Sequence, residues 1–173
     1  MTPIYKISDR FVDDLSLLNP ILATSLGITG HETELGDFSP EGSNRNAELV
    51  KSTLLELRSQ SPLTQRDNIA KEVMIEQLSN DLTLYEMGEH FRDLNIMHSP
   101  LQSIRMVFDQ MPKTTEQEWK NITERLTRIP AALDDYRKTL ADGISRDLVS
   151  TVRQVAGCAE QVRTWLCSCS LVS

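Results

Sequence analysis

The chain has 173 residues, 39% hydrophobic and 25% charged, which is enough to bury the core of one ordinary globular domain. Its formal net charge of -7 argues against a nucleic acid or an anionic membrane as partner, because either would require a concentrated Lys/Arg surface. No stretch approaches the roughly 18 apolar residues of a membrane span, and the first residues lack the pattern of a secretory signal. We therefore expect a cytoplasmic protein that binds neither nucleic acid nor membrane.

Helix signals follow one another from the start of the chain, and no run of alternating apolar and polar residues competes with them. Ser8 and Asp9 are suited to cap a first helix, which should stop near Asn19 because Pro20 disfavours helical geometry in the residue before it. A short helix is predicted over residues 21–26. Three glycines then indicate an irregular segment that continues to residue 39.

Two longer helices are predicted next. Ser39 followed by Pro40 is a sound helix start, and the apolar spacing carries that helix to about Ser59. Thr64 with Asp67 resembles a capping box and predicts a long helix that reaches His90. Its expected inward stripe consists of Ile69, Val73, Leu78, Leu82 and Tyr85.

The second half of the chain predicts four more helices. Ser99-Pro100 opens one that ends before Pro112, and Thr115 to Glu118 forms a capping box for another, which Pro130 interrupts or kinks. A third runs from 131 to 140 and ends at Gly143. Ser145 or its neighbour is suited to cap the last, whose valines include Val149 and Val152. The inward residues expected of the capping-box helix are Trp119, Ile122 and Leu126.

These signals together predict an all-α fold, an irregular array of several helices. Phe38 should anchor the glycine-rich segment against the helices. The stripe that starts at Ile69, the face around Ile104 and the valine-rich last helix offer more apolar surface than a small bundle easily covers, so we expect part of it to remain exposed.

Metal-binding motifs are incomplete. His31-Glu32 is followed by Leu35, where a zinc protease helix would carry its second histidine. His90 and His98 are eight residues apart, a spacing of no standard motif, so two unrelated helix-end histidines are the preferred interpretation. The cysteines at 158, 167 and 169 lack the paired spacing of a structural zinc site, and we expect no cofactor in this chain.

No catalytic motif is complete either. The sequence has no nucleophile elbow, no phosphate-binding glycine loop and no convincing cysteine-histidine pair. Arg105 and Asp109 are spaced to pair across one helical turn, and a surface or interface ion pair is favoured over a substrate contact. No catalytic residue is assigned. The candidates for cleft or loop contacts are His31, Asp37, His98 and Arg105.

Several segments in a fixed order resemble the beginning of bacterial proteins in the domain of unknown function 885 family. The resemblance covers nearly everything except the last ten residues or so. Its segments are 19–28, Gly30-His31, 37–42, Arg66-Asp67, 99–105, 108–112, Arg125-Leu126 and 129–133.

Members of that family are much longer and resemble helical zinc metallopeptidases with a His-Glu motif in their later half. The resemblance implies that residues 1–166 are a single helical N-terminal region, an incomplete part of a larger metallopeptidase-like fold, and that residues 167–173 are an atypical tail. Such a region would wall a substrate cleft and be inactive alone, with zinc only in the missing C-terminal portion. Its partner would be that portion or a second copy. A self-standing helical interaction module and a non-functional gene remnant remain the alternatives.

Overall fold

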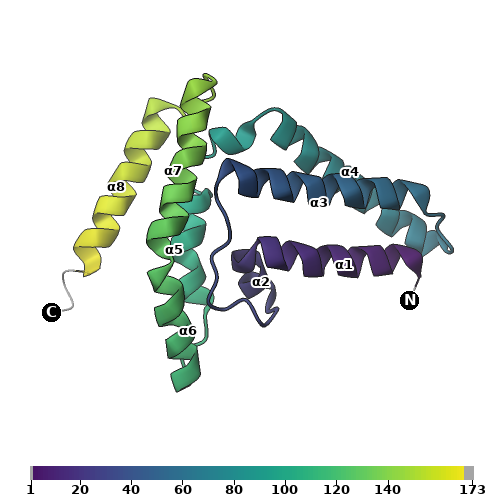
Figure 1. Ribbon diagram of the computed structural model, residues 1–173, viewed down its shortest axis with the longest axis horizontal. Helices are drawn as coiled ribbons and strands as arrows, with labels where there is room; N and C mark the ends of the chain where they lie inside the picture. Colours follow the sequence, from purple (N-terminus) through teal and green to yellow (C-terminus); the bar gives the residue numbers. More distant parts are fainter. Residues whose placement is uncertain (1, 170–173) are drawn as a thin grey trace.

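The computed structural model describes residues 2–169, which form an all-α fold without a strand in that range, as predicted. The helices lie in two groups that run in different directions (Figure 1). One group holds α1, α3 and α4, the other holds α5, α6 and α7, and α2 lies where the two groups meet. The elements are α1 (Pro3–Leu18), α2 (Pro20–Leu26), α3 (Pro40–Ser59), α4 (Gln65–Glu86), the short 3-10 helix η1 (Glu89–Phe91), α5 (Pro100–Gln110), α6 (Glu116–Thr127), α7 (Ile129–Ser145) and α8 (Val152–Cys169).

Helix α1 begins at Pro3, so the start predicted at Ser8 and Asp9 is wrong. Proline at the first helical position costs no intrahelical hydrogen bond. Ile4 and Ile7 are buried against α3, and this packing stabilises the first turns, which carry no side-chain cap.

The capping signals predicted for α3 and α4 are confirmed, and Asn19 caps α2, which was not predicted from the sequence. The Asn19 side chain accepts a hydrogen bond from the Leu22 backbone N–H at 3.0 Å, and Ser39 accepts one from Gly42 at 3.2 Å. Thr64 caps α4 by accepting from the backbone N–H of Asp67 at 3.1 Å. The predicted end of α3 at Ser59 is confirmed as well.

Helix α4 ends at Glu86, before the predicted His90, because Gly88 adopts a left-handed φ of 75° and starts the separate helix η1. The predicted inward stripe is partly wrong, since Ile69 and Val73 are 55% and 61% exposed. Both sides of α4 carry apolar residues, so spacing alone does not decide which side faces the core. The buried side consists of Ala70, Met74, Ile75, Leu78 and Leu82.

The predicted starts of α5 and α6 are confirmed, each by a capping box. The inward face predicted for α6 is wrong at Trp119 and Leu126, which are exposed, whereas Ile122 and Arg125 are buried. Helix α7 runs past the predicted end at Gly143. A Cβ atom on residue 143 would lie 2.5 Å from the Phe91 carbonyl oxygen, so Gly143 permits α7 to pack closely against η1.

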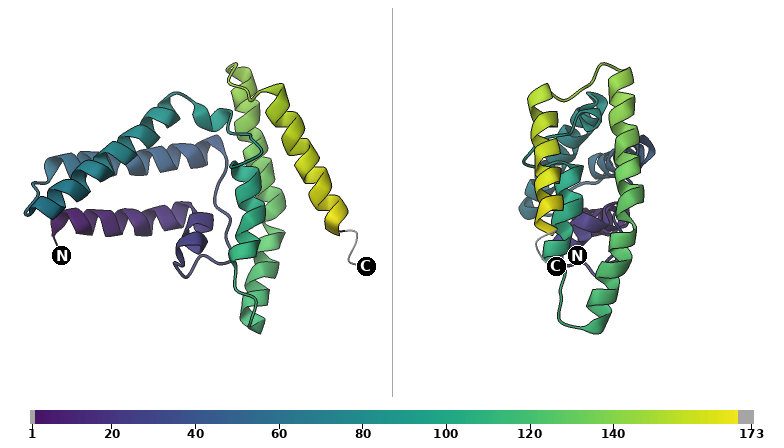
Figure 2. Two further views of the ribbon diagram at one scale, coloured as in Figure 1. Left: turned by 180° about the vertical axis from the view of Figure 1, so that it is seen from behind. Right: turned by 90° about the vertical axis from the view of Figure 1, so that its left-hand side faces the viewer.

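Helix α8 begins at Val152 and not near Ser145, and Val149 lies in the connection before it. It stands alongside α5 and α7 (Figure 2) and is attached to α5 by a hydrogen bond of 2.9 Å from Gln102 to Gln161. It extends to Cys169, past the boundary predicted at residue 166; residues 170–173 of the expected tail lie outside the described residues, and that division stays a prediction.

Each of the two helix groups has its own apolar core. The first lies between α1, α3 and α4, and the second joins Leu35 to Ile104, Val107 and Ala132, which covers the α5 face that we expected to be exposed. The accessible surface is nevertheless 10,926 Å², whereas a compact protein of 19.6 kDa exposes about 8,600 Å². The additional accessible surface reflects an open arrangement of the helices, in which apolar residues of α4 and α8 are exposed to solvent.

Candidate functional site

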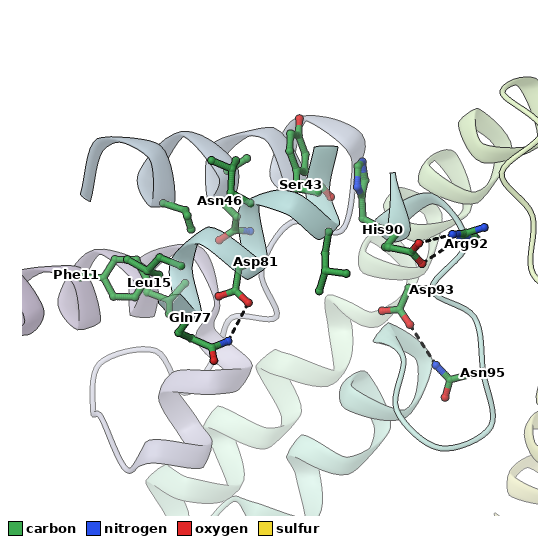
Figure 3. Close-up of a pocket in the computed structure, with 17 residues that line it drawn as sticks. Phe11, Leu15, Ser43, Asn46, Gln77, Asp81, His90, Arg92, Asp93 and Asn95 are labelled. Atoms are coloured by element: carbon green, nitrogen blue, oxygen red, sulfur yellow. Dashed lines mark hydrogen bonds and ion pairs between the residues drawn. The ribbon is translucent and has the colours of Figure 1, made fainter. Parts of the chain in front are cut away.

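A cleft of about 880 Å³ lies between α1, α3, α4 and η1, and its size is in the range of small-molecule and peptide pockets. Figure 3 shows Phe11 and Leu15 at one end and His90, Arg92 and Asp93 at the other. Its apolar lining comes from Phe11, Leu15, Ala47, Val50, Leu78, Leu82 and Leu84. The cleft therefore has an apolar stretch that leads to a polar end.

The polar end carries more acid than base. Arg92 pairs with Glu89, its Nε lying 3.1 Å from a carboxylate oxygen, so these two charges neutralise each other. Asp81 accepts a hydrogen bond from Gln77 at 3.0 Å, and Asp93 accepts one from Asn95 at 3.2 Å. Neither aspartate has a Lys or Arg partner within ion-pair distance among residues 2–169.

Asp93 marks the junction between the two helix groups. Although much of the residue is exposed, burial of its carboxyl group raises the pKa of Asp93, and the nearby His98 and Asn95 only partly offset this. Its backbone carbonyl accepts a hydrogen bond of 2.5 Å from the hydroxyl of Tyr136 on α7, which fixes the η1–α5 connection against α7.

His90 is a neutral polar residue at the η1 end of the cleft. Its ring stacks on Tyr85 with centroids 4.8 Å apart, and burial, together with the charge of Arg146, lowers the pKa of His90. Nδ1 is buried and has no hydrogen-bond partner within the described part of the chain. The ring is uncharged at neutral pH, and its buried Nδ1 is a polar atom that no described group satisfies.

The predicted contact residues His31 and Asp37 lie in the loop between α2 and α3, outside the cleft. Arg125 holds this loop by donating to the His31 carbonyl at 2.7 Å and the Glu34 carbonyl at 2.8 Å. Asp37 pairs with Arg45 and accepts from the Ser39 backbone N–H at 2.8 Å. Burial opposes the shift, but these bonds lower the pKa of Asp37. Both residues serve the loop's own structure here.

The other two candidates lie apart from this loop and from each other. His98 is exposed in a recess that also contains Asp93, and its backbone N–H donates to the Asn95 side chain at 2.7 Å. Arg105 pairs with Asp109 on the exposed side of α5, which confirms the predicted ion pair. The structure thus does not bring the four candidates together, and their contact roles stay predictions.

The cleft acids Asp81 and Asp93 were not among the residues singled out from the sequence. No motif marks them, since their common site depends on how α4 and η1 pack against α1 and α3. His90 was assigned only as a helix-end histidine, and the glycine at 88, which ends α4 just before it, is the one local signal of its special place.

The family model described as "Bacterial protein of unknown function (DUF885)" matches residues 20–170. The chain belongs to this family. A search of curated proteins finds no match, so the DUF885 assignment establishes kinship without an activity.

The metallopeptidase resemblance implies a zinc centre only in the later half of the family's proteins, and not among the residues of this DUF885 chain. Among residues 2–169, no three His, Cys, Asp or Glu side chains come together in a group that could hold a metal ion. Cys158 is a buried free thiol and Cys167 an exposed one. No helix in the described part is long and apolar enough to cross a membrane.

Proposed function

We propose that this DUF885 chain forms the helical wall of a substrate cleft in a metallopeptidase-like protein and does not catalyse hydrolysis alone. The observation that carries the proposal is the cleft between α1, α3 and α4, whose apolar stretch continues into a polar end. An extended peptide presents side chains that an apolar stretch can bury, together with backbone amides that need hydrogen-bond partners. The cleft offers both kinds of contact.

The residues at the polar end are suited to binding and not to bond cleavage. Asn46 and the neutral His90 provide uncharged hydrogen-bonding groups, and Asp93 provides a carboxylate. Ser43 also lines the cleft, but in the described part of the chain no hydrogen bond joins its hydroxyl to His90 or Asp93, so these residues do not form a catalytic triad. In this proposal the zinc and its ligands belong to a separate portion, and this chain only orients the peptide.

Exposed apolar residues support the proposal that this helical wall binds a partner. Ile69, Val73 and Met87 lie on the outer side of α4, and Val152 on α8 is 87% exposed. Exposed apolar patches of this kind favour association, so we propose that the C-terminal portion of the family, or a second copy, covers them. The proposal includes the cytoplasmic location expected from the sequence, which fractionation of cells expressing the tagged chain would test.

The experiment fills the cleft and measures peptide binding. Gln77 and its neighbour Glu76 are both exposed, but only Gln77 lines the cleft. Gln77→Trp should weaken binding of a pool of apolar, dye-labelled peptides at least tenfold by fluorescence anisotropy, and the matched Glu76→Trp should leave it unchanged. Equal binding by both variants would show that the cleft is not the peptide site.

A further inference from the structure

We propose that the occupant of the cleft is a basic amphipathic peptide segment, in which apolar residues lie along α1 and α3 and a Lys or Arg side chain pairs with Asp81 or Asp93. This inference rests on the proposed function and names its substrate class. It follows from the distribution of charge in the cleft.

The direction of the segment follows from the two ends of the cleft. Phe11, Leu15 and Val50 line the part nearest α1, where no charged residue is among the lining side chains of α1 and α3. Arg92 and Asp93 lie at the η1 end of the cleft, whereas Asp81 of α4 lies beside Gln77, between that end and Leu15 (Figure 3). A bound segment whose apolar part contacts Phe11 and Leu15 therefore places a cationic side chain either at Asp81, beside that part, or at Asp93, at the opposite end.

The sign of the ligand's charge follows from the pairing of these groups. Arg92 is the only Lys or Arg among the residues that line the cleft, and Glu89 already neutralises it. Asp81 and Asp93 hold hydrogen bonds only to side-chain amides, so two negative charges remain open to a cation. An acidic ligand would meet two like charges and no free base, whereas a basic one would find a partner.

The burial of Asp93 strengthens this preference. A partly desolvated carboxylate is less stable in its charged form than one in water, and a cation brought next to it restores that stability. The formal charge of -7 on the whole chain acts in the same direction at longer range.

The test uses three nine-residue peptides that are identical except for Lys, Gln or Glu at one position near the end of an apolar stretch. Each carries an uncharged fluorophore and is titrated by anisotropy at low salt, at chain concentrations where sedimentation shows a monomer. The Lys peptide should bind at least tenfold more tightly than the Glu peptide, with the Gln peptide between them. Raising the salt to 0.5 M should reduce the difference.

Variants at Asp81 and Asp93 test whether these two residues cause the preference for the Lys peptide. In the double variant Asp81→Asn/Asp93→Asn, the ratio of the Lys to the Glu peptide should fall below threefold, whereas Glu76→Gln, on the same helix but outside the cleft, should keep it. Unchanged thermal unfolding will show that each variant is folded, and if the double variant is not, Asp81→Asn alone should lower the ratio at least twofold.

The outcomes separate the two proposals. Equal binding of the three peptides, or a preference that survives removal of the aspartates, would overturn this inference but leave a peptide cleft in place. No binding of any peptide would overturn both. Self-association that Gln77→Trp abolishes would mean that a second copy fills the cleft, and the basic-peptide inference would be wrong.

Discussion

Replacement of Arg125 tests how the loop between α2 and α3 is held. Arg125 is fully buried on α6, and its guanidinium donates to the carbonyl groups of Glu34 and His31 at 2.8 and 2.7 Å, and to that of Pro20 at 3.4 Å. These acceptors belong to a segment with no regular structure of its own. We expect Arg125→Met, which keeps most of the volume, to release this loop from α6.

The magnitude follows from the bonds that are lost. A hydrogen bond that involves a charged group contributes about 1.5–3 kcal/mol. Two of the three bonds are short enough to count fully, which gives about 3–6 kcal/mol. The variant also removes a buried charged group, and the Nη1 of Arg125 has no partner in the described part of the chain. Its removal therefore offsets part of the lost stability. The expected net loss in the free energy of unfolding is therefore about 3 kcal/mol.

Urea denaturation followed by circular dichroism would measure this loss, with Arg128→Met as the matched control. Arg128 lies next to the same helix and forms an exposed ion pair with Glu124 at 3.0 Å, so its removal should cost under about 1 kcal/mol. A loss below about 1 kcal/mol for Arg125→Met would contradict the assigned role, because the loop would then be held by other contacts.

Two further predictions concern the loop anchor and the cleft histidine. Leu35 is 3% exposed while Phe38 is only half-buried, so Leu35→Ala should cost about 3 kcal/mol in urea denaturation and Phe38→Ala clearly less; the reverse order would refute this anchor. Burial lowers the pKa of His90 in the folded state, so the unfolded chain binds more protons once the pH falls below about 6.5. Stability should therefore decrease from pH 7.5 to 5.5, and His90→Phe should lose less over that interval, whereas an identical decrease in both proteins would exclude His90 as a cause.

Helix starts could be predicted well because their signals are local. Ser39-Pro40, Ser99-Pro100 and the Thr115 capping box satisfy the first backbone N–H groups within a few residues, so the sequence contains all that is needed. The start of α1 was missed since its first turns depend on the packing of Ile4 and Ile7 against α3, which no local signal reports.

Burial was harder to predict than helicity. Helices α4 and α6 carry apolar residues on more than one side, and the structure buries Leu78 and Ile122 while Ile69 and Trp119 remain exposed. Which side turns inward depends on the neighbouring helices. The capping bond of Thr64 with Asp67, by contrast, lies within four consecutive residues and was predicted.

The residues that line the cleft were even harder to predict from the sequence than the buried side of a helix. The lining of the cleft comes from α1, α3, α4 and the segment that follows α4. Phe11 and Asp93, which are far apart in the sequence, therefore line the same cleft. Local spacing places neither residue there. Gly88 ends α4 with a left-handed turn, but the stacking of Tyr85 on His90 that follows from this turn is visible only in the structure.

The most direct test of the central claim is site-specific photo-crosslinking with a photoreactive phenylalanine at position 77 or at position 76. Position 77 lies in the cleft and position 76 outside it. We expect a labelled apolar peptide to crosslink from position 77, to be displaced by excess unlabelled peptide, and to crosslink from position 76 at background level. Equal yields at the two positions, or crosslinks from position 77 that reach only another copy of the chain, would contradict a peptide-binding cleft.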